Sequence, residues 1–181
     1  MAHSFEIHPE ALRRRFFVYV VIAQGDGKSL LYVGKTGDNR EGCNPLISRC
    51  GNHFSYNKIH SQVRNKIETY EEWRYTYVFD HFDEYCDDPG ERRARIDRIN
   101  EMERWLNAEI QLAVRGCSSI ELLNPYSGVA RYSRTEQQKR LAFRTSEAKR
   151  KLAAIVEKVR RVLCIQGANN AIQAKDENAR A

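Results

Sequence analysis

The chain lacks a long apolar run, and its first residues lack the pattern of a leader segment. Its longest apolar stretch, Phe16 to Ala23, is far shorter than the roughly 20 residues that a membrane-spanning helix requires. The residues from Met1 to Glu6 show no charged start followed by an apolar run, so we expect no targeting segment. These two absences predict a cytoplasmic protein with no membrane partner.

Cysteine is also scarce, which weakens a disulfide or metal interpretation. The five cysteines are odd in number and widely spaced, as expected for reduced thiols: Cys43, Cys50, Cys86, Cys117 and Cys164. Cys43, Cys50, His53 and His60 carry zinc-ligand chemistry, but structural zinc sites usually bring ligands in pairs two to four residues apart. A zinc-binding structural protein is therefore one alternative, and the spacing of these residues does not favour it.

What the chain has in excess is positive charge. It contains 30 Lys and Arg against 24 Asp and Glu, a net charge of +6, with a pI near 9.1. Lysine and arginine gain free energy on nucleic acid through counterion release, so the charge favours a polyanionic partner. We expect DNA, with RNA not excluded. The alternative is that the charge serves solubility alone.

The order of apolar segments predicts an α+β fold. Residues 16–23 and 29–33 read as strands, and Asp26-Gly27 between them is a favoured hairpin turn. A third strand is predicted at 73–82. Helices are predicted over about 45–54, 58–69, 91–115 and 135–164. The expected core is a small three-stranded antiparallel sheet flanked by helices, in the order β-β-α-α-β-α, followed by a long basic helix.

These elements divide the chain into four predicted parts. Residues 1–15 form an N-terminal segment, and 16–130 form the main domain. Residues 131–165 carry the basic amphipathic helix, and the polar residues 166–181 are expected to be a disordered tail.

Four side chains from separate elements have the chemistry to handle a phosphate. Tyr19 and Tyr32 lie on the two hairpin strands, and Arg49 and His53 follow on the first helix. Because Arg49 and His53 are four residues apart, they share one helical face. Guanidinium offers two parallel donors to a phosphate. Each residue also has a purely structural interpretation, such as a packed strand tyrosine.

Together these motifs resemble the GIY-YIG nuclease superfamily, which includes homing endonucleases, repair incision subunits and some restriction enzymes. The resemblance rests on Val18-Tyr19-Val20, on Tyr32-Val33-Gly34, on Arg49 and His53, and on Asn124. It covers about residues 16–128. Phe17 stands where the first motif has glycine.

The resemblance implies a metal-dependent DNA endonuclease that uses Mg²⁺ or Mn²⁺. Tyr19 would help to activate water, beside Lys35, and Tyr32 would position the attack. Arg49 would stabilise the phosphate, with His53 and Asn124 in supporting roles. A glutamate on the long helix would hold the metal.

Two glutamates of that helix compete for the metal role. Glu103 and Glu109 lie on opposite edges of its apolar stripe, at about 100° per residue. Trp105 and Leu112 widen the stripe toward Glu109, so we predict Glu109 as the metal ligand, with Glu103 as the alternative.

The C-terminal helix is a second basic feature. Between Arg134 and Arg161 ten Lys or Arg stand against three Glu. We predict that it contacts the DNA backbone, with Lys35 and His60 contributing from the main domain; its candidate contacts are Lys139, Arg140, Lys149, Arg150 and Lys151. Its apolar face allows the alternative of a homodimer. The alternative to the nuclease as a whole is a catalytically inactive GIY-YIG-fold module that binds nucleic acid or a partner.

Overall fold

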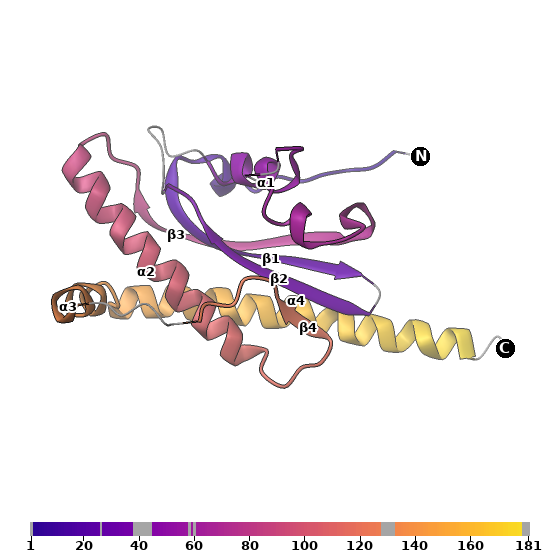
Figure 1. Ribbon diagram of the computed structural model, residues 1–181. Helices are drawn as coiled ribbons and strands as arrows, with labels where there is room; N and C mark the ends of the chain where they lie inside the picture. Colours follow the sequence, from indigo (N-terminus) through magenta and orange to yellow (C-terminus); the bar gives the residue numbers. More distant parts are fainter. Residues whose placement is uncertain are drawn as a thin grey trace.

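A four-stranded mixed sheet forms the centre of the molecule. The computed structural model describes residues 2–25, 27–37, 45–57, 59, 61–127 and 133–178, with side chains of the last helix described through Cys164. The strands are β1 (Arg15–Gly25), β2 (Lys28–Lys35), β3 (Arg74–Glu84) and β4 (Ile120–Leu122). Their spatial order is β3-β1-β2-β4, so β1 and β2 are the two central strands (Figure 1). The α+β class is confirmed.

The predicted hairpin is present and is longer than expected. β1 pairs with β2 from Val18–Lys35 to Gly25–Lys28, which leaves a two-residue turn. Gly27 in this turn has φ of 69°, a conformation that glycine adopts without strain. Gly34 does not end the second strand, because β2 continues to Lys35.

The fourth strand corrects the prediction of three antiparallel strands. Ile120–Leu122, which was not among the predicted strands, pairs parallel to Ser29–Leu31 of β2. Three residues carry too little pattern to identify a strand. The sheet is therefore mixed rather than purely antiparallel.

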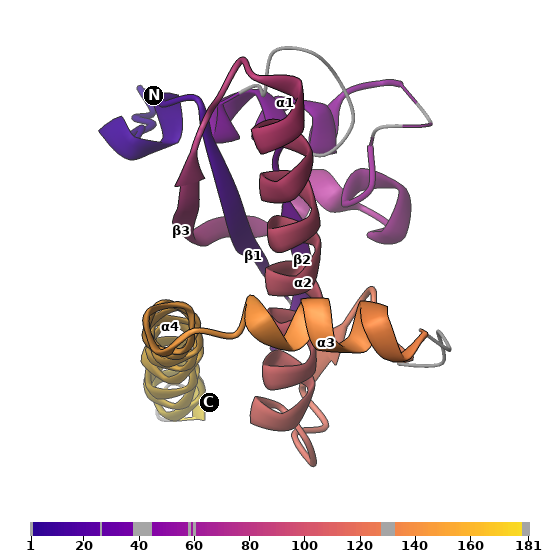
Figure 2. The same cartoon turned by 90° about the vertical axis from the view of Figure 1, so that its left-hand side faces the viewer.

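Helices and turns cover both faces of the sheet. One face carries α1 (Leu46–Phe54) and the short 3-10 turn η1 (Pro9–Leu12). The other carries α2 (Pro89–Ala113) and α4 (Ser146–Asn178), while α3 (Arg134–Ala142) crosses α2 (Figures 1 and 2). Asp88 caps α2 by accepting a hydrogen bond from the Glu91 N–H.

The prediction of a helix over 58–69 is wrong, because the described residues of this segment form no α-helix. The chain instead forms 3-10 turns at Arg64–Lys66 and Tyr70–Glu72, and Thr69 between them has φ of 51°. Ile59, Val63 and Ile67 are spaced as on one face of a helix; Val63 and Ile67 are buried, but Ile59 is 76% exposed. The four-residue spacing of these side chains is met by a folded loop rather than by a helix.

The single helix predicted over 135–164 is two helices. Phe143 packs against the core, and the Thr145 hydroxyl accepts a hydrogen bond from the Ala148 N–H, which starts α4 afresh. The backbone of α4 then continues to Asn178, through most of the segment predicted to be a disordered tail.

The two sides of β1 contribute to two separate apolar clusters. Phe16, Val18, Val20 and Ile22 pack against α2 and α4, whereas Phe17, Tyr19, Val21 and Ala23 face α1 and the 61–67 loop. No helix in the described part of the chain is long and apolar enough to cross a membrane. The alternation of β1 decides which side chains reach the candidate site.

Candidate functional site

A buried tyrosine–histidine pair is the centre of the site. The Tyr19 hydroxyl oxygen lies 2.7 Å from His53 Nε2, which joins β1 to the last turn of α1. Both residues are almost fully buried, at 1% and 3% exposed. The Nδ1 of His53 is buried and has no hydrogen-bond partner within the described residues. This pair is one the sequence predicted to converge.

Burial fixes the protonation of both groups. Desolvation lowers the pKa of His53 from 6.5 to about 4, helped by the nearby Arg49 charge, so the imidazole is neutral at pH 7. Desolvation, followed by the neighbouring Tyr32, raises the pKa of Tyr19 well above 10. Tyr19 is therefore a neutral phenol that cannot ionise without passing its proton to a partner.

Gly34 gives the Tyr19 ring the space that it occupies. The two residues are directly paired across β1 and β2. A Cβ at position 34 would lie 2.6 Å from the Tyr19 hydroxyl oxygen and ring carbon Cζ. Any larger residue at position 34 would displace the Tyr19 ring. This is a physical reason for the glycine in Tyr32-Val33-Gly34.

Three further groups lie around this pair. The Tyr32 ring packs edge-on against His53, with centroids 5.1 Å apart. Arg49 Nε donates to the Lys35 carbonyl at 3.4 Å, which brings the guanidinium to the end of β2. The Arg49 charge also affects the pKa of both Tyr19 and His53. Tyr32, Lys35 and Arg49 therefore lie with the buried pair, as predicted.

Glu103 is the glutamate that reaches this cluster. Its carboxylate lies 3.1 Å from Lys35 Nζ and is 28% exposed. Its charge contributes to raising the pKa of Tyr19. The helix α2 therefore passes the end of β2 closely enough for a carboxylate to join groups on the other face of the sheet.

The structure places Glu109 elsewhere and contradicts its assignment to the same site. Its Oε1 accepts a hydrogen bond from Trp105 Nε1 at 3.0 Å. It lines a cavity between α2 and α4 together with Lys149, Leu152 and Arg160. Trp105 widens the apolar stripe because α4 packs there, and α4 rather than the tyrosine cluster is what Glu109 faces.

Asn124 has a structural position at the edge of β2. Its amide oxygen accepts from the Val33 N–H at 3.0 Å, and its amide nitrogen donates to the Val33 carbonyl at 2.7 Å. Asn107 of α2 in turn donates to the Asn124 carbonyl at 2.8 Å. Asn124 thus holds Val33 near the end of β2, and Val33 is two residues before Lys35.

Most of the predicted C-terminal DNA contacts are engaged within the protein. Lys139 pairs with Asp97, and Arg140 pairs with Glu101 and Glu136. Lys151 donates to the His81 carbonyl and lies near Glu147. Only Lys149 and Arg150 of the predicted set are exposed without such a contact in the described structure.

The apolar face of α4 is also occupied. Ala148, Leu152, Ile155 and Val159 are buried against the sheet and α2 of the same chain. The described part of that face is therefore not available for the homodimer considered from sequence.

Of the four zinc-ligand candidates named from the sequence, Cys50 and His53 lie within the described residues. Cys43 and His60 lie outside the described residues, so the predicted phosphate contact of His60 does too. Burial raises the pKa of the Cys50 thiol to about 11, which opposes its use as a thiolate ligand. Within the ranges the structure describes, no group of three or more His, Cys, Asp or Glu gathers to hold a metal.

Sequence reasoning missed Tyr77 as part of the site's surroundings. Its ring lies 6.0 Å from Tyr19 and 6.3 Å from His53, and burial raises its pKa. Its position on β3, opposite Val21, places it on the same face as Tyr19. The two-residue alternation of the strands carried that signal.

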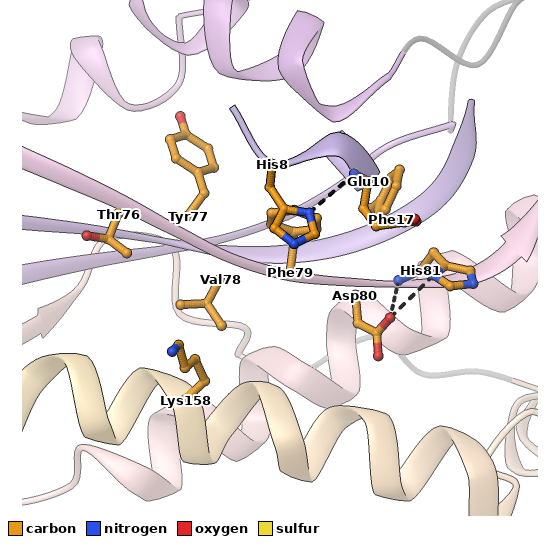
Figure 3. Close-up of a pocket in the computed structure, with 10 residues that line it drawn as sticks. All are labelled: His8, Glu10, Phe17, Thr76, Tyr77, Val78, Phe79, Asp80, His81 and Lys158. Carbon is orange, nitrogen blue, oxygen red and sulfur yellow. Dashed lines mark hydrogen bonds and ion pairs between the residues drawn. The ribbon is translucent and has the colours of Figure 1, made fainter. Parts of the chain in front are cut away.

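A separate cavity of about 250 Å³ lies at β3. Thr76 to His81 line it, with His8 and Glu10 on one side and Lys158 of α4 on the other (Figure 3). Tyr32, Lys35, Arg49 and Glu103 do not line it. The cavity is therefore not the space in which a phosphate would meet these groups.

Comparison of the chain with protein-family models, with curated proteins and with solved structures gives no match.

Proposed function

We propose that this protein is a metal-dependent DNA endonuclease that hydrolyses phosphodiester bonds through a GIY-YIG-type site. The observation that carries the proposal is the convergence of two tyrosines, a lysine, an arginine, a histidine and a glutamate from four elements: Tyr19, Tyr32, Lys35, Arg49, His53 and Glu103. Phosphodiester hydrolysis needs an activated water and compensation of the charge that develops on phosphorus.

The tyrosine–histidine pair supports a proton relay. Water gives a proton to the Tyr19 oxygen as its own oxygen bonds to phosphorus, and Tyr19 passes its proton to His53 Nε2. The 2.7 Å contact suits this transfer. The lowered pKa keeps the His53 ring neutral, so that Nε2 has a lone pair for the proton, and it also makes the ring a weaker base than a solvent-exposed histidine. Because the pKa of Tyr19 is raised, its hydroxyl does not lose a proton to solvent at neutral pH, and the relay needs His53 as the proton acceptor.

The cationic side chains serve the phosphate. Arg49 can offer two parallel N–H donors to its oxygens, and Lys35 adds a point charge at the end of β2. Tyr32 packs on His53 and so restricts where the ring can move. These groups stabilise the negative charge of the transition state as the leaving oxygen departs.

Glu103 fits a hard divalent cation. It supplies carboxylate oxygen, the ligand type that Mg²⁺ and Mn²⁺ prefer, and Mg²⁺ commonly uses one or two protein carboxylates with water and phosphate oxygens completing its shell. When bound there, the ion would neutralise charge on the phosphate and the leaving oxygen. Lys35 holds the carboxylate at the cluster.

The alternative of a binding module without catalysis has one observation in its favour. Tyr19 and His53 are 1% and 3% exposed, so the relay lies beneath the surface and a substrate must approach through Tyr32, Lys35 and Arg49. A module of this kind would bind DNA in a salt-sensitive way and cleave none.

Nicking of supercoiled plasmid with Mg²⁺ or Mn²⁺ tests the proposal. Glu103→Gln should reduce the nicking rate by about a hundredfold or more, because it removes the charge that holds the metal. Glu109→Gln is the matched control: it removes the same charge from the same helix and keeps an oxygen for Trp105. It should cleave like the wild type.

Equal cleavage by wild type and Glu103→Gln would show that Glu103 holds no essential metal. Salt-sensitive binding of DNA with no cleavage by the wild type would instead support the binding module.

A further inference from the structure

A second concave surface lies between α2 and α3. It is a cavity of about 590 Å³, large enough for a nucleotide. Four arginines line it, Arg104, Arg115, Arg140 and Arg144, against the single carboxylate of Glu101. The lining therefore carries a net charge of +3 at neutral pH.

The one carboxylate of the lining is buried and is paired with two of the four arginines. The Glu101 side chain is 4% exposed and is held by Arg144 at 2.7 Å and by Arg140 at 3.3 Å. Such an arrangement fixes the two guanidinium groups in place, since a buried carboxylate would be costly without them. The arginines at this wall are thus positioned before any ligand arrives.

The lining of the cavity also includes apolar and aromatic side chains. Leu112 and Leu141 border it while remaining 55% and 63% exposed. Tyr126 and Gln111 also line it. Apolar and aromatic surface beside guanidinium groups suits a ligand that has both phosphates and flat rings or sugars.

Hydrogen bonds connect the cavity to the candidate active site. Gln111 donates to the Asn107 side-chain oxygen at 2.9 Å and to the Tyr126 carbonyl at 3.1 Å. Asn107 in turn donates to the Asn124 carbonyl, and Asn124 holds Val33 of β2. Glu103 and Arg104 are adjacent on α2, so the two sites begin on neighbouring faces of one helix.

We propose that this cavity binds the sugar–phosphate backbone of the DNA strand that is cut at the Tyr19–Glu103 cluster. The inference rests on the proposed function. α2 ends at Ala113, ten residues beyond Glu103, and Arg115 follows two residues later. At about 1.5 Å per residue, roughly 15 Å of helix axis separate Glu103 from this end. At about 3.4 Å per phosphate along a strand, that distance spans roughly four nucleotides. The cavity would therefore bind backbone phosphates flanking the cleaved bond.

The test is the affinity for a short labelled duplex, measured by fluorescence anisotropy in EDTA over a series of salt concentrations. Arg104→Gln with Arg115→Gln should weaken binding about tenfold at low salt. The slope of log Kd against log salt should fall by about 2, one for each phosphate contact removed. Arg140 and Arg144 are left intact because they hold Glu101.

Arg93→Gln is the control. Arg93 lies on the same helix, is 77% exposed and pairs only loosely with Asp97 at 3.7 Å. It should leave affinity and slope unchanged, and a melting curve of each variant confirms folding. Unchanged binding in the double variant, or an equal loss in Arg93→Gln, overturns the inference.

Binding and cleavage are read separately, so the two proposals can fail separately. Nicking in Mg²⁺ is measured on the same proteins, and at DNA concentrations below the Kd the double variant should nick more slowly in proportion to its weaker binding. If the wild type binds through the cavity but cleaves nothing in Mg²⁺ or Mn²⁺, the nuclease proposal fails and the binding site stands.

Discussion

The two faces of β1 are built for different purposes. Toward α2 and α4, Val18, Val20 and Ile22 belong to an apolar cluster that packs these two helices on the sheet. Toward α1, Tyr19 stands among Phe17 and Val21 but carries a hydroxyl paired with His53. One face supplies stability, and the other places a polar pair where burial alters its proton affinity.

This difference has a physical consequence. Truncating a side chain in the apolar cluster lowers the stability of the fold by leaving a cavity, and this loss does not depend on pH. A buried imidazole stabilises the fold only while it stays neutral, so its contribution depends on pH. The four predictions below separate the two faces, from the largest expected change to the smallest.

Leu106→Ala tests the apolar face. Leu106 is fully buried between α2 and the sheet. The substitution should lower the free energy of unfolding by about 2–5 kcal/mol through lost burial and a residual cavity. Urea unfolding at pH 7 measures it, and the loss should be the same at pH 5. A loss below 1 kcal/mol would mean that this face is not closely packed.

His53 should make the stability of the protein pH-dependent. Its pKa falls from 6.5 in the unfolded chain to about 4 in the fold, so the unfolded state takes up the proton first as the pH drops. The stability it contributes is complete above pH 6.5 and is lost progressively toward pH 4, about 3 kcal/mol in all.

Urea unfolding across this pH range measures the effect, and His53→Gln should flatten the curve by that amount. If His53→Gln keeps the wild-type curve, His53 is not buried as a neutral ring.

Gly34→Ala tests the close approach on the polar face. The new methyl group would meet the Tyr19 ring at 2.6 Å, so the ring must move. We expect a loss of about 1–3 kcal/mol in stability and reduced plasmid nicking.

Gly51→Ala is the matched control, because a Cβ there meets nothing within 4 Å on α1. It should stabilise the protein by about 0.5–1 kcal/mol. Equal behaviour of the two variants would contradict the packing of Tyr19 on Gly34.

Asn124→Ala tests the link between the faces. It removes two hydrogen bonds from the buried Val33 backbone, and we expect a loss of about 1–2 kcal/mol. Hydrogen exchange should increase at Val33 and Lys35 and remain unchanged at Val20. Unchanged exchange at Val33 would show that the amide is dispensable.

The sequence predicted the elements with strong local patterns. The hairpin followed from two apolar runs around Asp26-Gly27, and α2 from Asp88 and an apolar stripe beginning near Ile96. The failures involve tertiary context. Val63 and Ile67 have helical spacing but are buried by a folded loop, and β4 exists only because β2 offers an edge.

The expectation that Glu109 faces the tyrosine cluster is wrong for a related reason. Trp105 and Leu112 broadened the stripe, and the prediction assumed that one apolar stripe faces one partner. The helix instead has the sheet on one side and α4 on the next, so the inward direction at Glu109 leads to α4. Residue spacing gives angles around a helix but does not say which partner lies at each angle.

Asn124 also bears on how this sheet avoids associating with other sheets. By occupying both the N–H and the carbonyl of Val33, its side chain does what the next strand would do beyond the short β4. On the opposite edge, Lys151 occupies the His81 carbonyl of β3. Two side chains thus block backbone groups that could otherwise pair with another molecule, which protects a strongly apolar hairpin from aggregation at these points.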